Sequence, residues 1–271
     1  PLVPLNLRKK AILAAVPTTS GTGSECTGVT VVHDMEEHRK VPIVSPELLP
    51  DYAILVPEFT FSMPPKLTAG TGLDALSHAF DAVVGKAQNE FSDALGLKAI
   101  EMIFKYLPRA FQNGQDREAR HRMLFAASMA GIAFGQNSTA LSHSFGHSVG
   151  AIFNIHHGLV CGMYIPYSLQ FYRTVSEKHL AICKALDLTR DPPEQGLAEL
   201  VAATKGLLSE LDVPLNLKDL GISKSDFENK LDDLALFAIE DVSTFSSPRP
   251  MTMNECKQIL RYSYDGKDID F

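Results

Sequence analysis

The sequence predicts a mainly α-helical protein with a small β-rich segment at its amino-terminal end. Short apolar runs bounded by proline or charged residues fill the first part of the chain. From about residue 59 onward, apolar residues recur at helical spacing. The chain has 271 residues and 45% hydrophobic content, which suffices for a sizeable core. We therefore expect two parts, residues 1–58 and residues 59–271.

Three stretches predict strands in the first part. "KAILAAVP", residues 10–17, is a short apolar run that ends at proline. "GVTVVHDMEEHRKVPIVS", residues 28–45, holds two β-branched runs on either side of a charged turn, which favours a hairpin. "YAILVPE", residues 52–58, is a further short strand candidate.

The second part is predicted to be all-helical. "MPPKLTAGTGLDALSHAFDAVVG" (63–85) and "DREARHRMLFAASMAGIAFGQ" (116–136) are rich in small apolar residues, and the second of them is expected to form a buried helix. "SDALGLKAIEMIFKYLPRAF" (92–111) has a helical period that we expect Pro108 to end. Four further amphipathic helices are expected within residues 176–188, 196–211, 223–241 and 252–266.

Composition excludes several classes of partner. The net charge is −7 and no dense run of lysine and arginine occurs, which argues against nucleic acid or an anionic membrane. No apolar run reaches the roughly 18 residues of a spanning helix, and no signal peptide opens the chain. The cysteines lie far apart with no CxxC pair, which is typical of reduced thiols inside a cell. These features predict a cytoplasmic enzyme.

Histidines cluster strongly in "HSFGHSVGAIFNIHHG", residues 143–158, where four of the nine in the chain fall. His143 and His147 are four residues apart, which places both on one helix face. Asp74 and His78 have the same spacing in "GLDALSHAFD", and His157 stands where another helix is expected to begin. A carboxylate with several imidazoles is a usual ligand set for zinc or ferrous iron.

Spacing alone leaves a second interpretation open, in which these pairs are structural accidents. A single Asp/His pair four residues apart often marks only a solvated helix face. His156, next to His157, fits either interpretation. The remaining histidines are expected to be surface or hydrogen-bonded residues without a role, namely His33, His38, His121 and His179.

The stretch "PTTSGTGSE", residues 17–25, follows the first predicted strand directly. Small hydroxylated residues and glycines leave backbone N–H groups open to a flat ligand or a phosphate. The stretch is neither a Walker motif nor GxGxxG, and by itself it is more typical of a polar loop between strands.

Together these stretches resemble the iron-containing (group III) alcohol dehydrogenase family. "AVPTTSGTGSE" resembles the family's nicotinamide-side loop, and "MPPKLTAGTGLDALSHAFD" its first metal-ligand segment. "AASMAGIAFGQNSTALSHSFGHSVGAIFNIHHG" is similar to the second ligand segment and "SPRPMTMNECKQIL" to the carboxy-terminal motif. The resemblance covers essentially the whole chain. His156 replaces a proline common in the family, and Ser247 an asparagine.

The resemblance implies a role for individual residues. The implied metal ligands are Asp74, His78, His143 and His157. His147 matches a histidine beside the nicotinamide and is the candidate catalytic residue that passes a proton to solvent. The implied cofactor-binding residues are Thr18, Thr19, Ser20, Gly21 and Thr22 in the loop, with Lys40 and Phe59 as further neighbours.

The resemblance also implies the fold, a dehydroquinate synthase-like architecture. In the family an amino-terminal dinucleotide-binding domain, whose "GGGS" loop grips the pyrophosphate, precedes an all-helical metal-binding domain. No such loop sequence occurs here. Residues 1–58 are therefore expected to be a remnant of the dinucleotide-binding sheet, residues 59–271 the metal-binding catalytic domain, and the chain a carboxy-terminal portion with little activity alone.

The implied reaction is reversible hydride transfer between an alcohol and NAD or NADP. A divalent metal, Fe²⁺ or alternatively Zn²⁺, would polarise the oxygen of a small alcohol or aldehyde. A homodimer is a further expectation, whereas nucleic acid and membranes are not expected partners.

The sequence leaves alternatives to this reaction open. A zinc-dependent glycerol dehydrogenase and a dehydroquinate-synthase-like enzyme would use a similar site, although the second needs a Lys/Arg cluster near the ligands that the sequence does not show. A helical HD phosphohydrolase needs an adjacent His-Asp pair, which occurs only at His33–Asp34 in the β-rich part. A non-catalytic metal-binding module is the third alternative.

Overall fold

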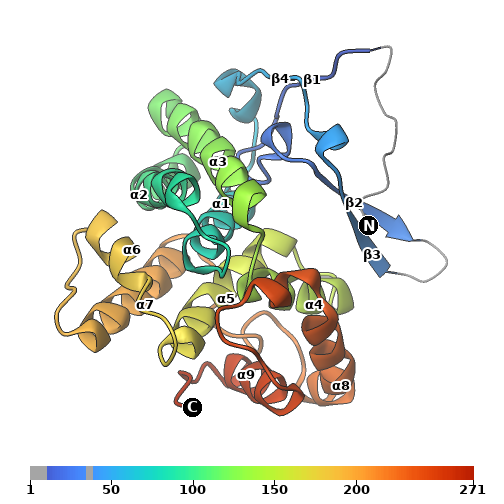
Figure 1. Ribbon diagram of the computed structural model, residues 1–271, viewed down its shortest axis with the longest axis vertical. Coiled ribbons are helices and arrows are strands. Elements are labelled where there is room, and N and C mark those ends of the chain that lie inside the picture. The colour runs from blue at the N-terminus through green and yellow to red at the C-terminus, as the bar shows by residue number, and fades with distance from the viewer. Residues whose placement is uncertain (1–10, 35–38) are drawn as a thin grey trace.

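The computed structural model describes residues 11–34 and 39–271, and α-helices dominate it (Figure 1). The helices of these ranges are α1 (Pro65–Val84), α2 (Glu90–Gln112), α3 (Arg117–Asn137), α4 (Leu141–Ile152), α5 (His157–Tyr172), α6 (His179–Ala185), α7 (Pro193–Glu210), α8 (Lys224–Glu240) and α9 (Met253–Asp265). The predicted helical part is confirmed, and α5 begins at His157 as the sequence indicates. None of the helices described is long and apolar enough to cross a bilayer.

Two small sheets lie in the amino-terminal part. Strands β2 (Val29–Asp34) and β3 (Arg39–Val44) pair antiparallel, with Val29 opposite Val44, so the predicted hairpin is confirmed. Strands β1 (Ala14–Ala15) and β4 (Tyr52–Ala53) pair parallel and are only two residues long, shorter than the apolar runs around them. Figure 1 shows the hairpin projecting beyond the helices.

Three short 3₁₀ helices accompany these strands. They are η1 (Ser24–Cys26), η2 (Pro46–Leu48) and η3 (Pro57–Thr60). Both η1 and η3 pack against α3, which connects the strand-containing part to the helices. The boundary expected at residue 58 falls within η3 and stays a prediction.

Helix α1 lies at the centre of the helical part. Every residue from Thr68 to Val84 is buried, and α1 packs against α2, α3 and α5. Many of these residues are alanine or glycine, whose small volume lets several helices approach one axis. The ionisable residues of this stretch, Asp74, His78 and Asp81, are therefore buried.

Side-chain caps explain where several helices begin. Asn89 accepts hydrogen bonds from the first-turn amides of α2, and Ser92 bonds back to the Asn89 amide. Thr252 and Glu255 form the same reciprocal pair at the start of α9. Such reciprocal pairs, known as capping boxes, provide hydrogen-bond partners for backbone amides that have none within the helix.

The expectation that Pro108 ends its helix is wrong. Helix α2 continues through Pro108 to Gln112, and the Asn113 amide then donates to the Arg109 carbonyl. Proline removes one backbone hydrogen bond, but Leu107 and Ala110 on either side of it are buried in the core. Tertiary packing thus outweighs the local break, as it commonly does for helix propensity.

Candidate metal centre

Three helices meet where the predicted metal ligands lie. Asp74 and His78 belong to α1, His143 and His147 to α4, and His157 to the first turn of α5. Glycines permit these helices to approach closely. A side chain at Gly158 would place its Cβ 2.2 Å from the Gly70 carbonyl oxygen and 2.5 Å from Asp74 Cβ. The α1–α5 contact at the site therefore requires glycine at position 158.

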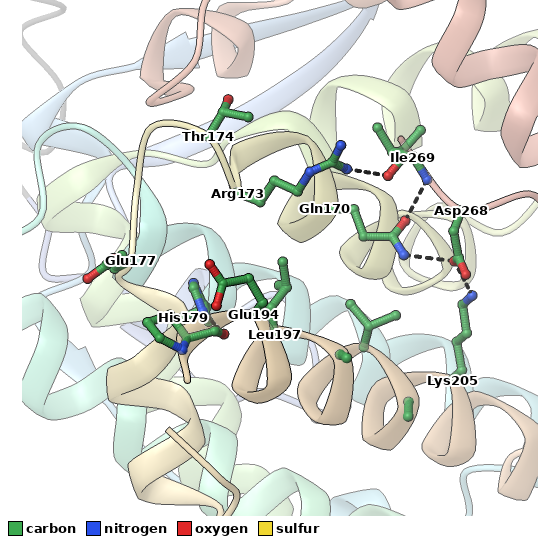
Figure 2. A pocket seen from close by; sticks show the side chains of 14 residues that line it. Gln170, Arg173, Thr174, Glu177, His179, Glu194, Leu197, Lys205, Asp268 and Ile269 are labelled. Carbon is green, nitrogen blue, oxygen red and sulfur yellow. Dashed lines mark hydrogen bonds and ion pairs between the residues drawn. The ribbon is translucent and has the colours of Figure 1, made fainter. Parts of the chain in front are cut away.

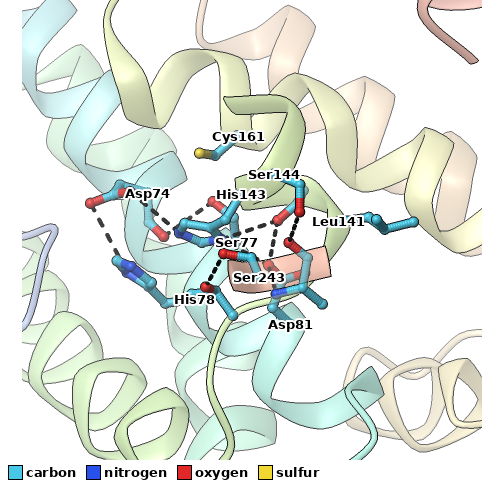
Figure 3. Close-up of polar contacts among 12 residues, drawn as sticks. Asp74, Ser77, His78, Asp81, Leu141, His143, Ser144, Cys161 and Ser243 are labelled. Atoms are coloured by element: carbon cyan, nitrogen blue, oxygen red, sulfur yellow. Dashed lines mark hydrogen bonds and ion pairs between the residues drawn. The ribbon is translucent and has the colours of Figure 1, made fainter. Parts of the chain in front are cut away.

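The structure brings three of the predicted ligands together with one unpredicted residue. Asp74, His143, His157 and Cys161 each offer one ligand atom, and these atoms all lie within 4.8 Å of one another. Asp74 Oδ1 is 3.4 Å from His157 Nε2 and 3.9 Å from His143 Nε2. Figure 3 shows the Asp74 carboxylate and the His143 ring facing the same space.

The fourth predicted ligand, His78, lies at the edge of this group. Its Nδ1 is 4.0 Å from the other carboxylate oxygen of Asp74, and its ring stacks on His143 with centroids 4.5 Å apart. Phe134 covers the opposite face of the His78 ring at 4.2 Å. His78 therefore contacts Asp74 and His143 from one turn further along α1, but it is not one of the four residues whose ligand atoms lie within 4.8 Å of one another.

Unpartnered polar atoms show that this donor set fits a cation. Asp74 Oδ1, His78 Nδ1 and His143 Nε2 are buried, and none has a hydrogen-bond partner among the described residues. An unsatisfied buried acceptor costs about 1–3 kcal/mol, so three of them in one place need compensation. One carboxylate and several imidazoles are the donors that Zn²⁺ and Fe²⁺ accept, and a bound cation would satisfy all three atoms.

Asp81 is a residue of the site that sequence reasoning missed. Its Oδ2 accepts hydrogen bonds from His143 Nδ1 at 2.8 Å, from the Ala140 amide at 2.7 Å and from the Ser142 hydroxyl at 2.8 Å. With Nδ1 donating to Asp81, the lone pair of His143 is on Nε2, the atom that faces Asp74. Asp81 lies seven residues after Asp74 on α1, two helical turns along the same face.

His147 lies beside the ligand group rather than within it. Its ring stacks on His157 with centroids 4.9 Å apart and planes at 10°, and its side chain is 34% exposed. Nδ1 donates to Asp241 Oδ2 at 2.7 Å, which leaves the lone pair on Nε2. Asp241, just after α8, is the second residue that sequence reasoning missed, because 94 residues separate it from His147.

The charged groups of the site shift one another's pKa. Burial alone would raise the pKa of the Asp74 carboxyl, but the three surrounding histidines lower it below its ordinary value. Burial lowers the pKa of His78 to about 3. Burial also lowers the pKa of His143, but the hydrogen bond and charge of Asp81 outweigh it and raise that pKa above its ordinary value. Without a cation, Asp74 is thus ionised and His78 neutral at pH 7.

The predicted cofactor loop packs onto α1, which carries Asp74 and His78, and onto α3. A Cβ at Gly21 would lie 2.8 Å from Thr71 Cβ, and Thr71 is three residues before Asp74 on α1. Gly23 has a positive φ of 59° and faces Gly131 of α3 so closely that neither position has room for a side chain. Glu25, buried after the loop, accepts a hydrogen bond from Ser128 of α3.

Within the loop, exposure differs from residue to residue. Thr18 and Thr22 are exposed, Thr19 is half-buried, and Ser20 and Gly21 are buried. The Ser20 hydroxyl has no hydrogen-bond partner among the described residues, so it remains available to a ligand. The loop is therefore anchored beside the metal-ligand helix and presents polar groups.

Phe59 and Lys40, the two further predicted cofactor neighbours, lie outside the loop of residues 18–22. Phe59 lies on η3, with 52% of its surface exposed. Lys40 falls in strand β3, and its side chain lies outside what the structure describes. Their roles stay predictions.

A separate cavity lies between α5 and α7, away from the ligand group (Figure 2). It has a volume of about 580 Å³, and none of the predicted site residues lines it. Along its wall, Asp268 joins Lys205 at 2.6 Å and the Gln170 amide at 2.7 Å. These contacts hold the last residues of the chain against α5 and α7.

Comparison with known proteins identifies relatives of this chain. The family model "Fe-containing alcohol dehydrogenase family, C-terminal" matches residues 68–264, and "Iron-containing alcohol dehydrogenase" matches residues 3–57. NADPH-dependent butanol dehydrogenase of Clostridium saccharobutylicum is 38% identical over 266 residues, which cover 98% of this chain and 68% of the relative.

Solved structures agree with the sequence comparison. The iron-containing alcohol dehydrogenase from Thermococcus thioreducens superposes with a TM-score of 0.89 at 33% identity, covering 98% of this chain and 67% of that one. Sulfoacetaldehyde reductase from Bifidobacterium kashiwanohense in complex with NAD⁺ gives a TM-score of 0.84 at 29% identity, covering 93% and 64%. This chain spans about two thirds of the length of each of these proteins.

The predicted resemblance is thereby confirmed over both the strand-containing and the helical parts. The matched residues include Asp74, His78, His143, His147 and His157. The chain belongs to the iron-containing alcohol dehydrogenase family.

Proposed function

We propose that this protein catalyses reversible hydride transfer between a small alcohol and NAD or NADP. One observation carries the proposal. In a chain of this family, a carboxylate oxygen and two imidazole nitrogens lie within 4.8 Å of one another in the interior, and two of these three residues have an unpartnered atom there. Relatives named butanol dehydrogenase and methanol dehydrogenase support alcohols as the substrate class.

Asp74, His143 and His157 would hold a divalent cation, with His78 as the fourth ligand from the next turn of α1. When bound, the cation supplies Lewis acidity that lowers the pKa of the substrate hydroxyl. The chain's own contribution is to fix the donors beforehand. Asp81 orients His143, and the glycine contact between α1 and α5 holds His157 next to Asp74.

Imidazole and carboxylate donors suit both Fe²⁺ and Zn²⁺, and they suit Mg²⁺ and Ca²⁺ poorly. We propose Fe²⁺ as the resident metal because the family's matched members are named for iron. Zn²⁺ is the alternative that the same residues would accept.

His147 is the proposed proton carrier. Its Nε2 lone pair is available because Nδ1 donates to Asp241, and its partly exposed ring reaches from the His157 ring toward solvent. An imidazole nitrogen with a free lone pair can accept the alcohol proton and pass it to water. Asp241 positions this ring through its hydrogen bond to Nδ1.

The nicotinamide cofactor would bind beside the loop of residues 18–22. Ser20 and Gly21 sit against α1 three residues before Asp74, so a flat ring on this loop would be close to the ligand group. The buried, unpartnered hydroxyl of Ser20 is a suitable hydrogen-bond partner for it. One relative is named as NADPH-dependent and another as NAD-dependent, so both cofactors belong in the test.

An assay of NAD(P)H formation from 1-butanol by Fe²⁺-loaded protein tests the proposal. We expect turnover that chelation abolishes and Fe²⁺ restores, that His143→Ala loses, and that the exposed His121→Asn keeps. Because the matched relatives are longer, we expect this chain to turn over more slowly than they do. Turnover that survives chelation or the His143→Ala change would refute the proposed site.

A further inference from the structure

Cys161 is the one member of the four-atom group that the proposed function leaves without a role. It lies four residues after His157 on α5, so both side chains project from the same helix face. Its sulfur is 3.5 Å from each nitrogen of the His157 ring, and the residue is fully buried. Figure 3 shows its thiol above Asp74 and His143.

The packing of α4 against α5 leaves room for the Cys161 sulfur. A Cβ at Gly146 of α4 would lie only 2.2 Å from Cys161 Sγ, so the sulfur occupies the space that glycine leaves between α4 and α5. The sulfur is thus held in a fixed place between the helix of His143 and the helix of His157.

The other buried cysteines differ from Cys161 in their hydrogen bonds. Cys183 donates to the Gly196 carbonyl at 3.3 Å and Cys256 to the Ala235 carbonyl at 3.7 Å. The polar groups within reach of Cys161 are instead the ring nitrogens of a proposed metal ligand. Two unpartnered buried atoms, Asp74 Oδ1 and His143 Nε2, belong to residues of the same group.

We propose that Cys161 is an additional, thiolate ligand of the cation that Asp74, His143 and His157 hold; the inference rests on the function proposed above. On binding, the thiol proton is released to solvent as the metal–sulfur bond forms, with no change of oxidation state. A thiolate is a softer donor than imidazole or carboxylate, so Cys161 shifts the preference of the site from Fe²⁺ toward Zn²⁺. The alternative is that Cys161 is only a buried neighbour of the metal site and forms no bond to the metal.

Cobalt substitution separates these two roles. Co²⁺ takes zinc-type ligands, its visible d–d bands report that it is bound, and a near-ultraviolet charge-transfer band reports a sulfur ligand. We expect the wild-type chain and Cys183→Ser, a matched change at another buried free thiol, to bind one Co²⁺ and show the sulfur band. In Cys161→Ser we expect the d–d bands to remain and the sulfur band to be lost.

The outcomes distinguish this inference from the function on which it rests. Wild-type protein that binds Co²⁺ without the sulfur band, or a band that persists in Cys161→Ser, overturns the thiolate ligand and leaves the proposed function standing. Wild-type protein that binds no Co²⁺ overturns both. Cys161→Ala provides a second variant, and retention of the d–d bands in either variant reports a folded site.

Discussion

At the scale of single residues, Asp81 determines which nitrogen of His143 can bind a metal. It accepts three hydrogen bonds through one carboxylate oxygen, and the shortest polar contact of His143 is the one to this oxygen. A carboxylate behind a ligating histidine fixes the ring and increases its basicity. Asp81 is therefore a positioning residue whose effect reaches the metal through His143.

We expect Asp81→Asn to weaken metal binding by about 10- to 100-fold at pH 8, the usual cost of losing such a partner. Competition with a fluorescent chelator would measure the affinity. Asp241→Asn is the matched control, because Asp241 contacts His147 and should leave metal affinity unchanged. Equal affinities for wild type and Asp81→Asn would contradict the role of Asp81.

The same variant should change the pH dependence of metal binding. Asp81 raises the pKa of His143 above its ordinary value, so protonation of His143 competes with metal binding from a higher pH than it would at an ordinary histidine. Without the Asp81 charge this pKa falls, and the loss of affinity on acidification should begin at lower pH in Asp81→Asn. A pH midpoint that stays in place or rises in the variant would show that Asp81 does not control His143.

Asp241→Asn should instead affect turnover. The variant loses the carboxylate that accepts a hydrogen bond from His147 Nδ1 and so leaves Nε2 as the proton-accepting atom. We therefore expect kcat to fall by up to about 100-fold, the lower range for a positioned proton-transfer group. The metal content should stay at the wild-type level, and the pH profile of kcat should change in the same sense as in His147→Gln. A fall in kcat together with loss of metal would indicate a merely structural role.

Single residues also show what the sequence can predict of a site. Spacing by four residues predicts that Asp74 and His78 share one helix face and that His143 and His147 share another, and the family resemblance implies the ligand set with His157. Neither signal pointed to Asp81, Asp241 or Cys161. Their partners lie far away in sequence or depend on how helices pack, and no local pattern marks one acidic residue among 32.

At the scale of elements, the approach of α1 to α5 depends on Gly158. We expect Gly158→Ala to destabilise the protein by about 1–3 kcal/mol and to weaken metal binding, because its Cβ would collide with α1 next to Asp74. Gly206→Ala, at an exposed position of α7, is the control, since nothing lies within 4 Å of its Cβ, and should stabilise by about 0.4–1 kcal/mol. Urea unfolding measures both, and a stable, metal-binding Gly158→Ala protein would contradict this account.

The helices themselves were largely predictable, since amphipathic periodicity persists through long segments such as α8 and α9. Pro108 was the exception. Its local signal predicts a helix end, and only the burial of Leu107 and Ala110 explains why α2 continues. The strands β1 and β4 are instead shorter than the apolar runs that predict them, because an apolar run does not determine how many of its residues find a pairing partner.

At the scale of the whole molecule, buried Arg120 joins three separate segments. Its guanidinium donates to the Met63 carbonyl, the Thr68 hydroxyl and the Gly114 carbonyl, each at 2.8–2.9 Å. The loop before α1, α1 itself and the α2–α3 connection are thereby fixed to α3. No sequence pattern predicts this role, because arginine is rarely fully buried.

We expect Arg120→Met to lower the free energy of unfolding by about 3 kcal/mol, because three hydrogen bonds from a charged donor are lost, two of them to buried partners, the Met63 carbonyl and the Thr68 hydroxyl. Chemical denaturation measures this loss. Arg117→Met is the matched control on the same helix. Its side chain is 76% exposed and its ion pair with Glu58 should contribute less than about 1 kcal/mol. Similar losses for the two variants would contradict the role assigned to Arg120.

The central claim concerns the whole arrangement, in which α1, α4 and α5 bring Asp74, His78, His143 and His157 to a single cation. The metal content of protein loaded anaerobically with Fe²⁺ and then desalted tests it most directly, by elemental mass spectrometry. The account predicts one equivalent of iron per chain in the wild type and in His121→Asn, and none in His143→Ala. A His143→Ala protein that keeps its equivalent, or a folded wild type that retains no metal, would contradict it.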